Sequence, residues 1–258
     1  MNLLFILDPL DTLNIKKDTS YAMMREAASR GHQTWAAQQK NISFIENKVM
    51  VNARQLSILD DRSAWYEVLE SKELAPAEID GIIMRKDPPF DMEYIYSTYL
   101  LESLEQDGCV VFNRPRSIRD FNEKLAITKY PEFIAPTVVT ADHTTIKQFI
   151  DKNNEIILKP LDGMGGSSIF RSRPDDPNLG VIIETLTDFG RRTIMVQKFI
   201  PQIKDGDKRV LLIDGEAVPF IPFDISPNIE LLRPGTNLLA IQGLNSGTSS
   251  SDFIIWPT

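Results

Sequence analysis

The feature that most constrains this chain is the alternation of short apolar runs with helix-patterned segments over its first 112 residues. The strand candidates are residues 3–7, 79–84 and 109–112, and the helix candidates are residues 20–30 and 92–106. Strands that alternate with helices form a mostly parallel sheet with helices on its faces. We therefore expect an α/β fold that begins with a parallel-sheet domain at residues 1–120.

The segment between the first helix candidate and the second strong strand is less regular. Residues 35–37 and 49–51 are weak strand candidates, and Glu46-Asn47-Lys48 predicts a turn between Ile45 and Val49. The polar sequence around Lys72 favours a helix.

A second region at residues 121–222 has an α+β pattern. Its strand candidates are residues 156–158, 168–170, 195–197 and 210–213, and its helix candidates are residues 118–128 and 178–188. Asp214-Gly215 predicts a hairpin turn, because this pair readily adopts positive backbone torsions. Residues 223–258 form a divergent tail without an assigned role, in which glycine, serine, threonine and asparagine are frequent.

Composition excludes several classes of function. The formal net charge is −8, so no global attraction draws the chain to nucleic acid or to an acidic membrane. Cys109 is the single cysteine, and its apolar neighbours favour a buried strand residue over a reactive thiol. The first residues read as a strand rather than a signal peptide, no apolar stretch is long enough to span a bilayer, and a cytoplasmic protein is expected. His32 and His143 lie outside every motif, which argues against a histidine-based mechanism.

The strongest local candidate for chemistry lies at residues 156–168. A strand candidate leads to Lys159, and a glycine-rich stretch at residues 163–166 follows it. Glycines let backbone N–H groups approach a polyphosphate closely, and a lysine adds a positive charge. No Gly-Lys-Ser/Thr follows and the next element reads as a strand, so the segment is not a P-loop. Taken alone it leaves open a glycine-rich hairpin with an exposed lysine.

Three further segments are ambiguous by themselves. Lys124 lies on the helix candidate at residues 118–128, where most lysines are solvated charges. Residues 197–200 could offer backbone groups and an aromatic face to a purine, or could form a buried edge strand. Residues 204–210 form a charged turn in which Arg209 offers a fork to an anion, although such clusters usually face water.

Six short strings, taken together, resemble the bacterial glutathione synthetases of the ATP-grasp superfamily. They follow the family's order and approximate spacing, and the resemblance covers residues 1 to about 220. The strings are residues 8–9, 14–20, 84–90, 122–125, 158–166 and 204–209. The combination is highly specific, whereas each string alone is not.

The resemblance implies an N-terminal pre-ATP-grasp domain for the peptide substrate, followed by an incomplete ATP-grasp α+β domain. The implied reaction joins γ-glutamylcysteine to glycine. ATP phosphorylates the cysteinyl carboxylate, and the glycine amine then attacks the acyl phosphate. The implied cofactors are ATP and Mg²⁺, and the family suggests a homo-oligomer, namely a tetramer.

The family's site residues can be carried over to matching positions. The lysines would bind ATP phosphates, residues 163–166 would form a flexible loop over them, and residues 197–200 would hold the adenine. The nucleotide site then comprises Lys124, Lys159, Gly163, Met164, Gly165, Gly166, Gln197, Lys198, Phe199, Ile200, Asp207 and Lys208. The peptide site comprises Lys17, Asp18, Arg85, Lys86 and Asp87, with Arg209 as the catalytic residue facing the peptide or its acyl phosphate. Such chemistry depends on charge stabilisation and positioning.

The resemblance ends after Phe220. The family continues with an arginine- and glycine-rich loop and a Glu-x-Asn pair that holds Mg²⁺. The acids beyond Glu216 are Asp224, Glu230 and Asp252, none of them in such a pair, so no metal ligand is nominated. Three interpretations remain: an active synthetase, a non-catalytic ATP-binding remnant, and another ATP-grasp carboxylate–amine ligase, against which the string at residues 85–89 argues. We expect ATP binding with little glycine-dependent ADP release.

Overall fold

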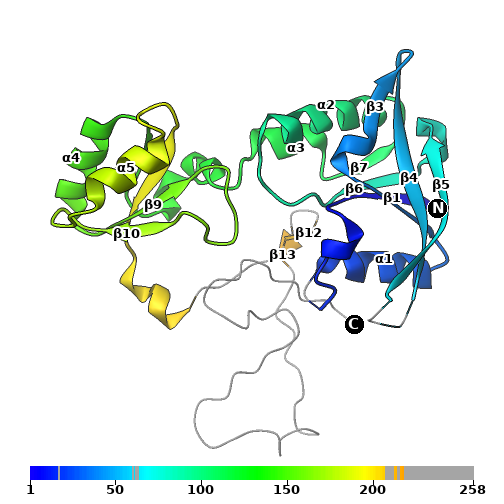
Figure 1. Cartoon of the computed structure of the whole chain (residues 1–258), viewed down its shortest axis with the longest axis horizontal. Helices are drawn as coiled ribbons and strands as arrows, with labels where there is room; N and C mark the ends of the chain where they lie inside the picture. The colour runs from blue at the N-terminus through cyan, green and yellow to red at the C-terminus, as the bar shows by residue number, and fades with distance from the viewer. Residues whose placement is uncertain (17, 60, 62–63, 207–211, 214–215, 218–258) are drawn as a thin grey trace, which may run out of the picture. The chain divides into compact units, whose positions relative to one another are not determined.

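A computed structural model describes the whole chain except residues 17, 60, 62–63, 207–211, 214–215 and 218–258 (Figure 1). The chain divides into two compact units, Met1–Phe199 and Ile200–Thr258. In the described part, no helix combines the length and the apolar character needed to cross a bilayer.

The N-terminal part of the first unit is a seven-stranded sheet with the order β3-β4-β2-β1-β6-β7, in which β5 pairs with β4. Its strands are β1 (Asn2–Ile6), β2 (Gln33–Ala37), β3 (Ile42–Ile45), β4 (Lys48–Ile58), β5 (Tyr66–Leu74), β6 (Gly81–Met84) and β7 (Val110–Phe112). The pairs β1–β2, β1–β6 and β6–β7 are parallel, which confirms the expected parallel sheet. Strands β3, β4 and β5 extend it with antiparallel pairs.

Helices cover both faces of this sheet because side chains alternate along its central strand. Leu4 and Ile6 of β1 lie in the core beside α2 (Met92–Gln106), whereas Phe5 and Leu7 lie in the core beside α1 (Thr19–Ser29). The expected helices at residues 20–30 and 92–106 are therefore confirmed (Figure 1). Gly31, with φ at +76°, follows the end of α1 as a left-handed stop. The expected burial of Cys109 is also confirmed.

The antiparallel extension combines one confirmed prediction with one error. Glu46 and Asn47 have φ values of 46° and 67° and connect β3 to β4, as expected for a tight hairpin. The helix expected around Lys72 is wrong, because this residue lies on β5, opposite Ala53 of β4. Strand β5 is polar and mostly exposed, so its state is decided by pairing with β4 rather than by its own pattern.

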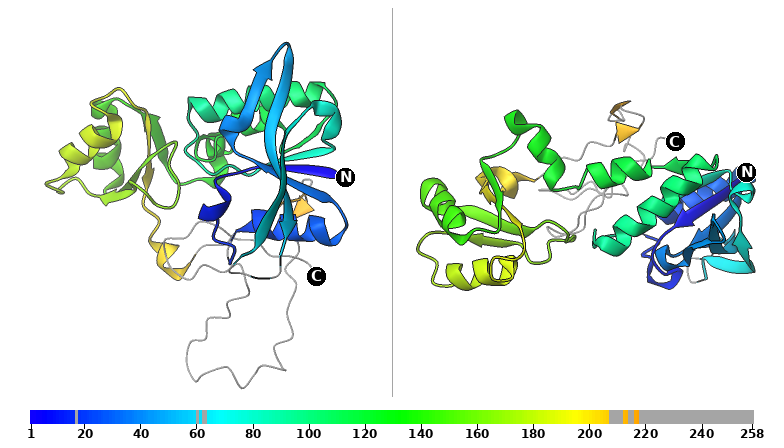
Figure 2. Two further views of the ribbon diagram at one scale, coloured as in Figure 1. Left: turned by 45° about the vertical axis from the view of Figure 1, so that its right-hand side comes forward. Right: turned by 90° about the horizontal axis from the view of Figure 1, so that it is seen from above.

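The second sheet of the first unit has four strands in the order β10-β9-β11-β8, all of them antiparallel to their neighbours. The strands are β8 (Thr137–Thr140), β9 (Ile156–Pro160), β10 (Phe170–Ser172) and β11 (Ile194–Lys198). Helices α4 (His143–Asn153) and α5 (Leu179–Thr187) lie against the same face of this sheet (Figure 2). They share one apolar core with β9 and β11. Sequence reasoning predicted β9, β11 and α5 but passed over β8 and α4.

The helix expected at residues 118–128 is wrong. Helix α3 (Pro115–Asp120) stops before Phe121, whose φ and ψ are −123° and 62°. The Asn122 side chain then accepts hydrogen bonds from the backbone N–H groups of Lys124 and Leu125, both at 3.0 Å. This local bonding competes with helix continuation, and only a short 3₁₀ turn follows.

Short 3₁₀ turns complete the described part of the chain. They are η1 (Leu10–Thr12), η2 (Gln39–Asn41), η3 (Pro76–Glu78), η4 (Leu125–Lys129), η5 (Pro131–Phe133) and η6 (Pro201–Asp205). In the second unit, β12 (Leu212–Ile213) pairs antiparallel with β13 (Glu216–Ala217), as expected for a hairpin around Asp214-Gly215, although those two residues lie outside the described part.

Candidate nucleotide and peptide sites

The four-stranded sheet has one face under helices, and its opposite face carries Lys159 and Gln197. Ile156 and Leu158 of β9 belong to the apolar core beneath α4 and α5. Ile157 and Lys159, which alternate with them, therefore point to the opposite face. We call this opposite face the open face. Because Gln197 of β11 lies directly across from Ile157, the nucleotide residues predicted on two different strands share this face.

The charge state of Lys159 is perturbed by its position. The residue is half-buried, and burial lowers the pKa of its ammonium group below the usual 10.5. The positive charge of Lys124 lowers this pKa further, whereas Glu123 opposes the change. Among the residues that the structure describes, none forms a hydrogen bond or ion pair with the Lys159 ammonium group. The positive charge of Lys159 therefore favours binding of an anion at this site.

The glycine-rich segment after β9 forms a tight turn with left-handed backbone. Gly165 and Gly166 have φ values of 65° and 77°, which a residue with a Cβ adopts only with strain. Ser168 has a φ of 57° as well, so the turn extends further than expected. Strand β10 accordingly begins at Phe170, and the strand expected at residues 168–170 is displaced by two residues.

Lys124 reaches this turn from the 3₁₀ segment rather than from a helix. Its ammonium group donates a hydrogen bond to the carbonyl oxygen of Gly163 and pairs with Glu123 at 2.6 Å. The Lys124 side chain is only 12% exposed. Asn122 adds a second link, because its amide nitrogen lies 3.3 Å from the carbonyl oxygen of Leu161. The structure thus brings Lys124, Lys159 and the glycine turn together.

The segment at residues 197–200 contributes unequally to the open face. Lys198 pairs with Ile156 and therefore lies on the helix-covered side, so only its backbone is available to a ligand on the open face. Its N–H donates to the carbonyl oxygen of Pro136 at 2.9 Å. The Gln197 amide donates to the Thr137 hydroxyl at 2.9 Å.

The backbone N–H of Phe199, like that of Lys198, is already bonded within the protein. Phe199 donates its N–H to the carbonyl oxygen of Glu155 at 2.9 Å, and Ile200 follows with 53% of its surface exposed. Backbone contacts from Lys198 and Phe199 to a purine would therefore use their carbonyl groups rather than their N–H groups. Sequence reasoning could not distinguish these possibilities.

The described residues among those predicted for the peptide site gather at the carboxyl ends of β1 and β6. Arg85 follows β6, and its guanidinium Nε donates to the Ser20 hydroxyl at 3.1 Å. Thr19 lies 3.4 Å from the same guanidinium. Asp18 caps α1 by accepting the N–H of Ser20 at 2.6 Å. Strand β1 lies between β2 and β6, which is the type of switch point where open α/β sheets bind ligands.

A second part of this cluster is built on Asp8, which sequence reasoning noted only as part of a string. Its carboxylate is 2.9 Å from the Lys86 ammonium group and accepts the Asp87 N–H at 3.0 Å. The Tyr94 hydroxyl donates to the carbonyl oxygen of Lys86 at 3.2 Å. Burial raises the pKa of Tyr94 to about 12, so its phenol stays protonated as a donor. Asp8 and Tyr94 therefore hold the segment that bears the predicted residues.

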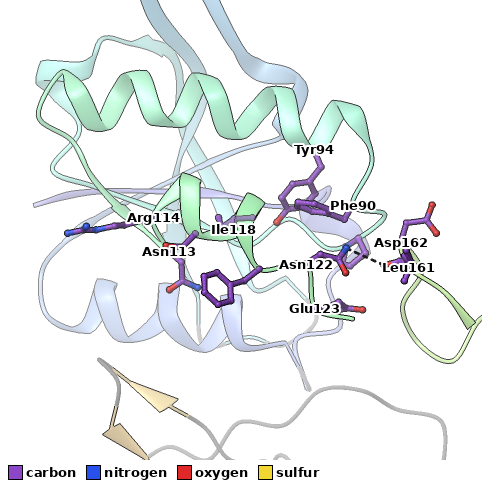
Figure 3. Close-up of a pocket in the computed structure, with 12 residues that line it drawn as sticks. Phe90, Tyr94, Asn113, Arg114, Ile118, Asn122, Glu123, Leu161 and Asp162 are labelled. Carbon is purple, nitrogen blue, oxygen red and sulfur yellow. Dashed lines mark hydrogen bonds between the residues drawn. The ribbon is translucent and has the colours of Figure 1, made fainter. Parts of the chain in front are cut away.

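A pocket of about 560 Å³ lies beside this cluster (Figure 3). The Phe90 and Tyr94 rings lie 5.1 Å apart, centroid to centroid, and form one wall. Further lining residues are Asn113, Arg114, Asn122 and Asp162. Figure 3 shows Asn122 hydrogen-bonded to Leu161, so the segment after β9 closes one side of the pocket. Sequence reasoning assigned no role to Asn113 and Arg114, which follow the strand candidate at residues 109–112, although polar residues after a parallel strand are a usual sign of a site.

Four predicted site residues lie outside the part of the chain that the structure describes: Lys17, Asp207, Lys208 and Arg209. Within the described residues, no group of three or more histidine, cysteine, aspartate or glutamate side chains is arranged to hold a metal ion.

Comparison with known proteins gives consistent matches. Residues 1–119 match the prokaryotic glutathione synthetase N-terminal domain, and residues 123–233 match the ATP-grasp domain of the same enzymes. Glutathione synthetase of Nitrosomonas europaea is 54% identical over 223 residues, which are 85% of this chain and 70% of that protein. The enzyme of Shewanella oneidensis is 48% identical over 215 residues, which are 83% and 68% of the two chains.

Among solved structures, a RimK-domain ATP-grasp protein from Sphaerobacter thermophilus is similar with a TM-score of 0.51 and 16% identity. The match covers 78% of this chain and 64% of that one, and it supports the ATP-grasp fold alone.

Proposed function

The chain belongs to the prokaryotic glutathione synthetase family, and we propose that it binds ATP at the open face and joins γ-glutamylcysteine to glycine. By this family membership it is an ATP-dependent carboxylate–amine ligase. The observation that carries the nucleotide part is the half-buried Lys159, whose charge has no partner among the described residues.

A polyphosphate fits the charge at this site. Lys124 is close enough to Lys159 to lower the pKa of the Lys159 ammonium group, and a bound triphosphate would oppose this effect. The turn at Gly165 and Gly166 lets backbone groups approach the phosphate oxygens without a Cβ in the way. In this proposal Lys124 exchanges the carbonyl oxygen of Gly163 for a phosphate oxygen when ATP binds.

The peptide substrate would bind beside the Asp8–Lys86 cluster. The pocket next to it has aromatic, amide and cationic groups, namely Tyr94, Asn113 and Arg114, that suit a small peptide with carboxylates. Because Asp162 also lines the pocket, it adjoins the turn that we assign to the phosphates. Such closeness is what transfer of a phosphoryl group to a peptide carboxylate requires.

The family uses ATP together with Mg²⁺. The described residues suit the triphosphate, but they offer no carboxylate cluster for the ion, so we assign no ligand to Mg²⁺ and no step to it. Bound ATP supplies the phosphoryl group that activates the peptide carboxylate. The described residues contribute binding, charge neutralisation and orientation.

The proposal is tested by titrating the full chain with ATP and Mg²⁺, and by measuring ADP release with γ-glutamylcysteine in the presence and absence of glycine. The proposed ligation requires ATP binding that Lys159→Ala weakens and ADP release that depends on glycine, whereas the sequence of residues 223–258 predicts little such release. Binding without glycine-dependent release would reduce the proposal to an ATP-binding protein of this family. Release with another amine, such as alanine, but not with glycine would indicate a different ligase. Absence of ATP binding would overturn the proposal.

A further inference from the structure

Three residues, Glu155, Arg171 and Phe199, form a closed cycle of contacts at one end of the open face. Arg171 of β10 donates to the Glu155 carboxylate from Nε at 2.9 Å and from Nη2 at 2.7 Å. The Arg171 guanidinium carbon also lies 3.8 Å from the centroid of the Phe199 ring. Phe199 closes the cycle, because its N–H donates to the Glu155 carbonyl oxygen at 2.9 Å.

The register places this cycle on the face that carries Lys159. Arg171 pairs with Ile157 in the antiparallel ladder, and directly opposed residues point to the same face. Ile157 and Lys159 are two positions apart on β9 and also share that face. Arg171 therefore belongs to the same surface as the proposed phosphate lysine.

The cycle and Lys159 lie at opposite ends of β9. Glu155 immediately precedes the strand and Lys159 is four residues further on, a separation of about 13 Å along an extended chain. An extended nucleoside triphosphate has a comparable length. If the triphosphate is at Lys159, its base lies at the end of the sheet that Glu155, Arg171 and Phe199 occupy.

We propose that Arg171 is a positioning residue for the base of the nucleotide. This inference rests on the proposed ATP binding. Arg171 fixes the Phe199 ring through its face and holds the Glu155 carboxylate, while the Glu155 carbonyl fixes the Phe199 backbone. The segment at residues 197–200 is thereby held in one orientation before the base arrives.

The proposal predicts that Arg171 affects the base and not the phosphates. Arg171→Ala should weaken ATP binding about 2- to 30-fold, the range of a single cation–π contact, and should leave inorganic tripolyphosphate binding unchanged. Arg171→Lys keeps the cation without the planar fork, so its ATP affinity should lie between those of the wild type and Arg171→Ala. Lys159→Ala should weaken the binding of both ATP and tripolyphosphate. Arg173→Ala is the matched control, because this exposed arginine lies two residues away and its ion pair is with Asp175 at 3.8 Å.

The experiment is a calorimetric titration of the full chain and these variants with ATP, GTP and tripolyphosphate, with thermal unfolding recorded for each variant. A loss for ATP alone in Arg171→Ala, with discrimination between ATP and GTP reduced, supports the proposal. Equal losses for ATP and tripolyphosphate, or unchanged ATP binding, overturn it. If Arg171→Ala does not fold, the same comparison is made with Arg171→Lys. Failure of the wild-type chain to bind ATP overturns the proposed function and the inference with it, whereas wild-type binding unaffected by Arg171 overturns the inference alone.

Discussion

The two sheets of the first unit differ in whether the cationic side chains of their candidate sites have partners within the protein. At the carboxyl ends of β1 and β6, Lys86 is paired with Asp8, and Arg85 is bonded to the Ser20 hydroxyl. On the open face of the four-stranded sheet, the Lys159 ammonium group has no hydrogen bond or ion pair from any described residue. Nearby Lys124 is bonded to the Gly163 carbonyl oxygen and to one carboxylate.

The difference indicates two kinds of preparation for a ligand. In the first cluster Lys86 has a carboxylate partner and Arg85 has hydroxyl partners, so its geometry is fixed before any substrate arrives and its hydrogen bonds contribute to stability. The second region keeps a cation that burial and a like charge disfavour, which costs stability but favours binding of an anion. In the proposed function, the first region would therefore orient the peptide, and the second would neutralise the charge of the phosphates.

The largest expected effects test whether the two regions are separately stabilised. Ile82 and Ile183 are both fully buried, but they lie in clusters with no residue in common. We expect Ile82→Ala and Ile183→Ala each to reduce the free energy of unfolding by about 2–5 kcal/mol, through lost burial and a cavity. Amide hydrogen exchange should accelerate chiefly in β1 and β6 for the first variant and in β9 and β11 for the second. Equal acceleration in both sheets would show that the regions unfold as one.

The next effect tests the phosphate site. Lys159→Ala should weaken ATP binding about 10- to 150-fold, which corresponds to the ~1.5–3 kcal/mol of a charge-assisted contact in a partly closed site. Lys72→Ala is the control, because Lys72 lies on β5 and is paired with Glu78 at 2.5 Å. The control should bind ATP as the wild type does. Equal losses in the two variants, measured by calorimetry, would remove the phosphate assignment.

A smaller effect tests the cluster around Asp8 and Lys86. Asp8→Ala should reduce the free energy of unfolding by about 1–3 kcal/mol, because the Asp87 N–H loses this acceptor and the Lys86 ammonium group loses its ion pair, keeping its hydrogen bond to the Asp87 carbonyl oxygen. Asp8→Asn keeps an acceptor oxygen and should lose less. Urea unfolding of both variants, with Lys159→Ala beside them, measures the contrast. The comparison fails if Lys159→Ala is destabilised as much as Asp8→Ala.

The smallest effect is a dependence on pH. Because the pKa of Lys159 is lowered in the folded chain, its charged form costs stability below that lowered pKa, and the cost disappears as pH rises toward 10.5. Lys159→Met lacks this group, so its advantage in stability over the wild type should shrink between neutral pH and 10.5. ATP affinity of the wild type should fall over the same interval, since the ammonium charge is lost there. A constant difference in urea midpoint across this range would contradict the assignment.

Much of this architecture followed from local patterns. The apolar run of β1, the spacing of α2 and the Glu46-Asn47 turn were predicted because each depends on neighbouring residues. Strand β5 was missed because its exposed polar residues are held by pairing with β4. The end of α3 was missed because the Asn122 side chain bonds to the backbone, which no periodicity reveals.

The candidate site shows the same division. Lys159 and the glycine turn were identified from residue type and order, because phosphate chemistry needs cations and close backbone groups. The partners that give each residue its role lie far away along the chain. Asp8 bonds to Lys86 across 78 positions, and Asn122 reaches Leu161 across 39. The pocket beside Tyr94 likewise draws on residues from several segments, and the sequence alone did not reveal it.

The sequence by itself determined the family and those strands and helices that have a clear local pattern, and it predicted the residues that would meet a polyphosphate, because these depend on short strings and on side-chain chemistry. The tertiary structure alone decided which charges are neutralised within the protein and which are left for a ligand. It placed Lys198 away from the open face and brought Arg171 onto the Phe199 ring. The physical reason is that burial and pairing depend on distances between strands, whereas a sequence records only the residues that each strand contains.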